Sequence, residues 1–137
     1  MKKALIIVQN KNNSTKRFGE QIAEFLFQRG LTAELIPINN FEPNKLDGAD
    51  YLLVGGFKNG SIFSKNDNEW ESFINKLPTL SGIKTALFAT YKNFPGSIFK
   101  KMRKYLKGKT EEVTFDLKSR DGYLSVSDKL DLNDFIK

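Results

Sequence analysis

The feature that most constrains the fold of this chain is an apolar run that leads, through a polar segment, into a helix. Residues 4–8 read Ala-Leu-Ile-Ile-Val, and a helical spacing of apolar side chains begins near Phe18. A polar segment between a strand and a helix offers backbone N–H groups, side-chain donors and the positive end of the helix dipole. We therefore predict an anion-binding loop here. Its residues are Asn10, Lys11, Asn12, Asn13, Ser14 and Thr15. Because Asn and Ser are also common helix caps, simple capping is the alternative interpretation.

The composition excludes several kinds of chemistry. The 137 residues include no cysteine and no histidine, so disulfides, thiolate nucleophiles and imidazole bases are excluded. The length suits one domain spanning residues 1–137 with a sizeable core. No apolar run reaches the roughly 18 residues of a membrane-spanning helix, and the start of the chain does not fit a signal peptide. We therefore expect a cytoplasmic protein with no membrane partner.

Positive charge is concentrated in the second half of the chain. The net charge is +6, and residues 70–137 carry thirteen basic and eight acidic side chains. Much of the excess lies in one segment, at Lys100, Lys101, Arg103, Lys104, Lys107 and Lys109. An excess of this kind favours an anionic partner, although a solvated helix face without a partner is an equally open interpretation.

Short apolar runs alternate with helical patterns along the chain. The runs occupy residues 4–8, 31–38, 51–54, 85–89 and 113–117. Apolar residues at helical spacing occupy residues 18–29, 70–77 and 98–106, with a weaker pattern at 130–136. This alternation predicts an α/β fold in which a doubly wound, five-stranded parallel sheet lies between two layers of helices.

The character of the runs predicts the order of the strands. The first, third and fourth runs are apolar throughout, which is typical of central strands that are buried on both faces. Polar and apolar residues alternate around Thr32 and Val113, so the second and fifth runs are predicted to be edge strands. The order 2-1-3-4-5 follows, with a switch point between the first and third strands. Ligands bind at that point in folds of this type.

Three loops are expected to meet at the switch point, and the first is the polar loop at residues 10–15. The loops after the third and fourth strands contain small and aromatic residues that suit the approach of a flat ring. The second loop is predicted to contribute Gly56, Phe57, Lys58, Asn59 and Gly60. The third loop is predicted to contribute Thr90, Tyr91, Lys92, Asn93 and Phe94. One loop for a phosphate and two for a planar ring describe a site for FMN.

With these loops in place, the chain resembles the flavodoxin family over nearly its whole length. The family's phosphate loop, Ser/Thr-x-Thr-Gly-x-Thr, aligns with residues 10–15 without a gap. Residues 51–55, Tyr-Leu-Leu-Val-Gly, look like the strand before the family's first ring-binding loop. Residues 80–88 are similar to the approach to its second. The resemblance implies a flavodoxin-like fold, FMN as the cofactor and electron transfer to a redox partner protein.

The chain departs from the family pattern at several positions. Asn10 and Asn12 replace hydroxyl residues of the phosphate loop, and Asn13 replaces its glycine. Asn tolerates a positive φ better than other non-glycine residues, so the loop can still close with Asn13 in that conformation. Asn59 stands where the family has an aromatic residue in the first ring-binding loop, so Phe94 is the better candidate for stacking on the ring.

The two ring-binding loops are basic, in contrast to those of acidic flavodoxins. Lys58, Lys65 and Lys92 lie in or near them, and no acidic residue occurs in residues 55–66 or 90–101. Positive charge stabilises a reduced, anionic flavin by Coulomb attraction. We therefore expect bound FMN to be less strongly reducing here. We also expect a partner with an acidic docking surface, or the phosphates of NAD(P)H.

Two other functions are compatible with the sequence. One is an FMN-dependent NAD(P)H reductase of quinone-like substrates, and the other is a flavin-free module whose basic helix contacts nucleic acid or an acidic protein. The absence of histidine and cysteine favours an electron carrier over an enzyme that turns over a substrate. Phe99 and Tyr105 fall on the apolar side of the basic segment, which disfavours nucleic acid as the partner.

Overall fold

The computed structural model describes residues 1–9, 12–58, 68–92, 96–111 and 113–137 of the chain. Strands and helices alternate along it. In chain order the elements are β1 (Lys3–Val8), α1 (Asn13–Gln28), β2 (Thr32–Pro37), the 3₁₀ helices η1 (Ile38–Asn40) and η2 (Pro43–Leu46), β3 (Tyr51–Lys58), α2 (Asn68–Lys76), β4 (Lys84–Tyr91), α3 (Ile98–Leu106), β5 (Val113–Ser119) and α4 (Val126–Phe135). None of the described helices is both long and apolar enough to cross a membrane.

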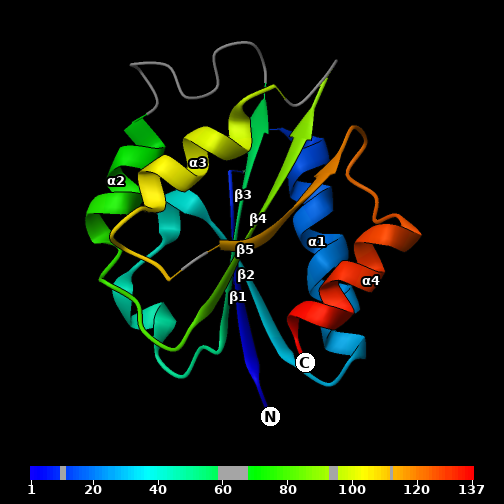
Figure 1. The fold of residues 1–137 in the computed structure, drawn as a ribbon, viewed down its shortest axis with the longest axis horizontal. Coiled ribbons are helices and arrows are strands. Elements are labelled where there is room, and N and C mark those ends of the chain that lie inside the picture. Colours follow the sequence, from blue (N-terminus) through cyan, green and yellow to red (C-terminus); the bar gives the residue numbers. More distant parts are fainter. Residues whose placement is uncertain (10–11, 59–67, 93–95, 112) are drawn as a thin grey trace.

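The strands form a five-stranded sheet in the order β2-β1-β3-β4-β5 (Figure 1). All four pairings are parallel, and the inner strand β1 places Ile6 between Leu35 of β2 and Leu53 of β3. The predicted fold class and strand order are confirmed. β2 and β5 are the edge strands, as their alternating residues predict. Most residues of both are exposed or half-buried, unlike those of the inner strands, because an edge strand is only partly covered.

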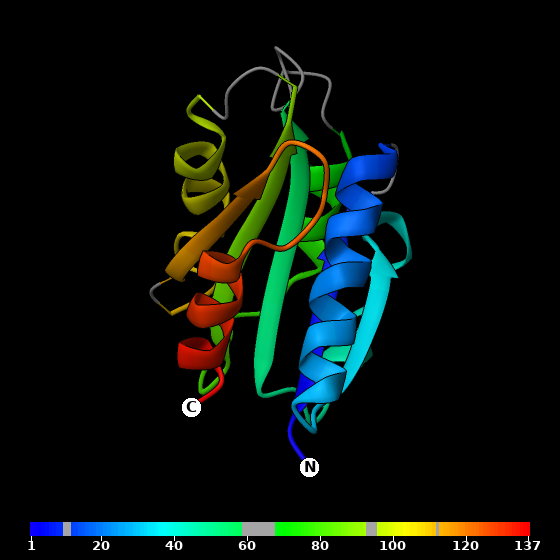
Figure 2. The same ribbon diagram turned by 90° about the vertical axis from the view of Figure 1, so that its right-hand side faces the viewer.

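Helices cover both faces of the sheet. α1 and α4 lie side by side on one face, and α2 and α3 lie on the other with the 3₁₀ helices (Figures 1 and 2). Successive residues of β1 point to opposite faces, so Leu5 and Ile7 join the core beneath α2 and α3, while Ile6 and Val8 join the core beneath α1. Burial on both faces explains why the central strands are continuous apolar runs.

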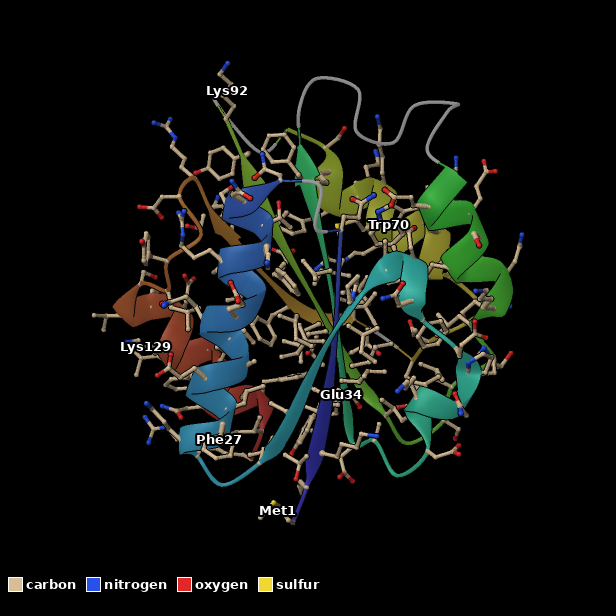
Figure 3. All side chains as sticks on the ribbon, turned by 180° about the vertical axis from the view of Figure 1, so that it is seen from behind. Met1, Phe27, Glu34, Trp70, Lys92 and Lys129 are labelled. Atoms are coloured by element: carbon tan, nitrogen blue, oxygen red, sulfur yellow. The ribbon has the colours of Figure 1, made fainter. Side chains whose placement is uncertain are left out.

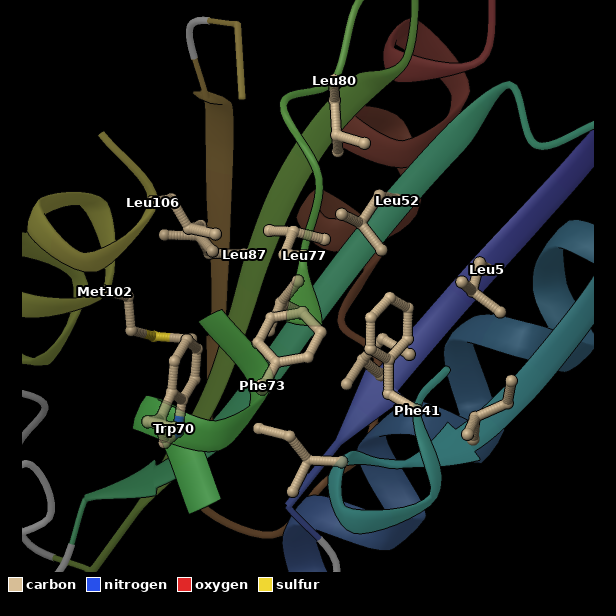
Figure 4. Packing of buried hydrophobic residues seen from close by; sticks show 14 of the residues in the cluster. Leu5, Phe41, Leu52, Trp70, Phe73, Leu77, Leu80, Leu87, Met102 and Leu106 are labelled. Atoms are coloured by element: carbon tan, nitrogen blue, oxygen red, sulfur yellow. The ribbon is translucent and has the colours of Figure 1, made fainter. Parts of the chain in front are cut away.

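The core on the α2 and α3 side is built around aromatic side chains (Figure 4). Trp70 of α2 is fully buried and its ring meets that of Phe73 edge-on, with the ring centroids 6.0 Å apart. Met102 and Leu106 bring the inner face of α3 to the same cluster. The helical spacing of Trp70 therefore reflects core packing.

Two strands continue beyond the apolar runs that predict them. β3 extends to Lys58 and β4 to Tyr91, so the first residues of both predicted ring-binding loops are strand residues. Pairing of Phe57 with Thr90 continues the ladder to this point. Within β3, residue 55 must be a glycine, because a Cβ on Gly55 would lie 2.0 Å from the Phe88 ring.

Two helices begin earlier than their apolar patterns. α1 starts at Asn13 rather than near Phe18, because the Asn12 side chain caps its first turn. α4 starts at Val126 rather than near residue 130, because Ser125 and Asp128 form a capping box. Capping residues are polar, so an apolar pattern cannot locate them.

Candidate functional site

The carboxyl ends of β1, β3 and β4 lie at one edge of the sheet, at the top of Figure 1. The connection from β1 through α1 leads to β2 on one side, while β3 lies on the other side of β1. This is the switch point of the fold, where the polar loop was predicted to bind an anion. Figure 3 shows Lys92 at this end of the molecule, opposite Met1.

The first turn of α1 gathers several hydrogen-bond donors. Asn12 Oδ1 accepts from the backbone N–H groups of Ser14, at 2.9 Å, and Thr15, at 3.3 Å, and the Ser14 hydroxyl donates to the same oxygen. The first turns of α1 and α3 carry no acidic side chain, whereas those of α2 and α4 do. Three donors around one oxygen, at the positive end of a helix without a carboxylate, form a chemical setting that suits an anion.

The described part of the predicted loop, residues 12–15, departs from what the family pattern predicts. Asn12 is extended, with φ −119° and ψ 130°, and Asn13 is already the first residue of α1. No described residue other than glycine has a positive φ, so Asn13 does not imitate the glycine that it replaces. Asn10 and Lys11, also predicted for this loop, lie outside the described residues.

A buried hydrogen bond joins two of the predicted loops. Thr15 in the first turn of α1 and Thr90 near the end of β4 are both fully buried, and their hydroxyl oxygens are 2.5 Å apart. The bond crosses the switch point from one predicted phosphate residue to one predicted ring residue. The structure thus brings one residue of each group into contact.

The described ring-site candidates lie at the ends of β3 and β4. Gly56 is buried, while Phe57 and Tyr91 are half-buried and Lys92 is exposed. Lys58 ends β3. Four further candidates of these loops lie outside the described residues, in the segments 59–67 and 93–95, namely Asn59, Gly60, Asn93 and Phe94. Lys65 lies outside them as well.

The loop after β5 is a part of this edge that sequence reasoning missed. It packs on the start of α1: Arg17 donates through Nη1 to the carbonyl oxygen of Asp121, and its guanidinium lies 4.9 Å from the centroid of the Tyr123 ring. Gly122 has φ +86°, and a Cβ there would lie 2.2 Å from the Ser14 carbonyl oxygen. The signal that could have found this loop is topological, because β5 is parallel and ends at the same edge.

Asp121 holds this loop in shape. Its Oδ1 accepts from the Ser119 hydroxyl at 3.0 Å and from the Tyr123 backbone N–H at 3.1 Å. The Tyr123 N–H, the Ser119 hydroxyl and the nearby Arg17 charge all favour the ionised form, so the pKa of Asp121 lies below its usual value. The carboxylate is thus a fixed acceptor within the loop.

Basic and aromatic side chains lie together at the end of β4, beside the predicted ring position. The Arg120 guanidinium lies 5.8 Å from the centroid of the Tyr91 ring, and Lys92 follows directly. Arg120, Lys92 and Arg17 place three positive charges at this edge. The carboxylate of Asp121, in the same loop as Arg120, places one negative charge there. The local charge is therefore suited to a phosphate or to an anionic ring.

Comparison with solved structures identifies the fold. A flavodoxin of Streptococcus pneumoniae TIGR4 superposes with a TM-score of 0.74 at 16% identity, over 97% of this chain and 94% of that one. Flavodoxin 1 of Bacillus cereus gives a TM-score of 0.71 at 19% identity, over 98% and 94%. A short-chain flavodoxin associated with a non-canonical PDU bacterial microcompartment gives 0.68 at 13%, over 98% and 94%. No protein-family model and no curated protein matches the sequence. The chain therefore has the flavodoxin fold.

Proposed function

We propose that this protein, which has the flavodoxin fold, is a cytoplasmic electron carrier that binds FMN and passes electrons to a redox partner protein. The observation that carries the proposal is the Thr15–Thr90 hydrogen bond at the switch point. It joins the helix start suited to a phosphate with the strand end suited to a ring. Both lie at the edge where folds of this type bind their ligands.

The phosphate of FMN would bind at the first turn of α1. Its oxygens would take the place of Asn12 Oδ1 as the acceptor of the Ser14 and Thr15 backbone N–H groups. The Ser14 hydroxyl adds a third donor. Asn13, together with Asn10 and Lys11 of the predicted loop, completes this proposed phosphate site.

The ring of FMN would lie against the ends of β3 and β4. Bound there, FMN would supply redox chemistry that none of the twenty side chains provides. Gly56 lets the backbone approach the ring closely, and Tyr91 offers an aromatic face. The remaining proposed ring contacts are Phe57, Lys58, Asn59, Gly60, Thr90, Lys92, Asn93 and Phe94.

The experiment compares FMN with riboflavin, which has the same ring but lacks the phosphate. The purified protein is titrated with each flavin, desalted and examined by absorption spectroscopy. We expect FMN to be retained and riboflavin to bind at least about tenfold more weakly, because the phosphate contacts are lost. A protein that retains no FMN would overturn the proposal.

A matched pair of serine variants tests where the phosphate binds. Ser14→Ala removes a donor in the first turn of α1, and Ser127→Ala changes an exposed serine in the first turn of α4. We expect Ser14→Ala to weaken FMN about fivefold or more and to leave riboflavin unchanged. Ser127→Ala should change neither. Equal weakening of both flavins by Ser14→Ala would place the phosphate elsewhere.

The electron-carrier and reductase interpretations differ in turnover. An electron carrier loaded with FMN should not consume NAD(P)H continuously, whereas an FMN-dependent reductase of quinone-like substrates should. The same loaded protein therefore separates the two interpretations in a single absorbance assay.

A further inference from the structure

An open groove runs along the outer side of α3. Its volume is about 810 Å³, and it is lined by residues of α3, of the segment that follows it and of the start of β5. The lining includes Ser97, which precedes α3, together with Leu106, Lys107 and Val113. Ser97 follows β4 closely in the chain, so the groove comes near the edge where the ring of FMN is proposed.

Four lysines around the groove have no ion pair with any described residue. Lys100, Lys101, Lys104 and Lys107 are all exposed. The other basic residues of the segment are engaged: Arg103 pairs with Asp116 at 2.8 Å, and Lys109 Nζ donates to the Leu77 carbonyl oxygen at 2.8 Å.

The acidic residue among the described lining residues forms no ion pair with these lysines. Glu111 Oε1 instead accepts from the backbone N–H of Gly82 at 3.0 Å. The four lysines outnumber this single carboxylate. The uncompensated amino groups leave a surface that attracts anions.

The opposite face of α3 anchors the helix that carries these lysines. Ile98, Met102 and Leu106 are buried, and Met102 reaches the Trp70 side chain (Figure 4). Lys100 and Lys104 are one turn apart on the other side of the helix, so a row of charges lies outward on an anchored helix.

From the row of unpaired lysines and the groove beneath it, we infer that the outer face of α3 docks an acidic surface of a partner protein. The inference rests on the proposed function, because the docked protein would be the redox partner. Docking here would bring that partner to the edge where the ring of FMN is proposed. Opposite charge would also speed the encounter.

The chemistry of the groove favours a protein over a nucleic acid. The two aromatic residues of α3, Phe99 and Tyr105, pack against the core, so neither is a stacking platform for bases. The groove lining instead combines the apolar residues Leu106 and Val113 with the lysines. Apolar side chains among charged ones are typical of a protein interface.

The experiment titrates the ¹⁵N-labelled full chain with cytochrome b5 as the acidic protein probe and with basic cytochrome c as the opposite charge control. We expect amide shifts in residues 97–111 with cytochrome b5, and none with cytochrome c. Because the contact is between charges, high salt should abolish it. The titration is made before and after FMN loading, so a failure to bind FMN and a failure to dock are separate results.

A matched pair of double variants locates the contact. Lys100→Gln/Lys104→Gln removes two charges from the row, while Lys118→Gln/Lys129→Gln removes two exposed charges from β5 and α4. We expect the first to weaken cytochrome b5 about fivefold or more, and the second less than about twofold. Equal weakening by both pairs would overturn the inference, as would shifts confined to other elements. Tighter binding of a short single-stranded DNA at α3 would overturn it in favour of nucleic acid.

Discussion

At the scale of the residue, two buried threonines on β4 have opposite hydrogen-bond environments. The Thr90 hydroxyl meets that of Thr15 at 2.5 Å, whereas the Thr85 hydroxyl is buried without a partner in the described part of the chain. A buried hydroxyl stabilises the fold when it is hydrogen-bonded and destabilises it when it is not. Substitution by valine, which has nearly the same shape, should therefore act in opposite directions at the two positions.

We expect Thr90→Val to lower the free energy of unfolding by about 1–3 kcal/mol, because it leaves the Thr15 hydroxyl buried without its partner. Thr85→Val should raise it by about 1 kcal/mol, because it removes an unpaired polar atom. Urea unfolding of the two variants and the parent protein measures both. A loss of similar size in both variants would show that packing, rather than hydrogen bonding, decides these positions.

Also at this scale, Gly122 allows the loop after β5 to touch α1. Gly122→Ala should lower the free energy of unfolding by about 2 kcal/mol or more, because the new Cβ would lie 2.2 Å from the Ser14 carbonyl oxygen. The control is Gly108→Ala, which also has a positive φ, +85°, but nothing within 4 Å. That variant reports the cost of the backbone conformation alone, about 1–2 kcal/mol. Equal losses in thermal unfolding would contradict the close approach.

At the scale of the element, the loop of residues 119–123 should respond to pH. The pKa of Asp121 is lowered in the folded protein, so the folded state binds fewer protons than the unfolded state at acid pH. The stabilisation is complete above the ordinary pKa of an aspartate, about 3.8, and is lost as the pH falls through the lower folded pKa.

The measurement is the backbone amide signal of Tyr123 between neutral and acid pH. We expect its shift to change at a pH below the usual aspartate range, and the change to vanish in Asp121→Asn. A midpoint at or above the ordinary value would contradict the hydrogen-bonded carboxylate. The start of α1 should follow the same titration, because Arg17 joins the loop to it.

At the scale of the whole molecule, the uneven charge should affect the bound flavin. The chain carries a net charge of +6, and Lys92 and Arg120 lie at the edge where the ring is proposed. We expect FMN in this protein to be less strongly reducing at its second reduction step than in acidic flavodoxins. Lys92→Gln should make that potential more negative, on the order of tens of millivolts, because it removes a nearby positive charge.

A potentiometric titration of the FMN-loaded protein measures the potential of the second reduction step. Lys129→Gln, on α4, is the control with an equal change of charge. A second reduction step as low as that of acidic flavodoxins would contradict the expectation. So would equal shifts in the two variants, because a distant charge is screened by salt.

The sequence by itself determined the fold of this molecule. Apolar runs such as residues 51–54 and helical patterns such as residues 98–106 are local, periodic signals, and their alternation leads to one strand order. The capping asparagine and serine residues at residues 12 and 125 were present in the sequence, but an apolar pattern did not locate the helix starts that they set.

The tertiary structure alone decided how the candidate site is assembled. Thr15 and Thr90 are far apart in the chain, as are Ser14 and Gly122, and no local pattern indicates that either pair is in contact. The lysine row on α3 was visible in the sequence, but which of its charges are neutralised depends on neighbours such as Asp116. Periodicity encodes which face of an element is buried, whereas contacts between elements depend on how those faces pack together in three dimensions.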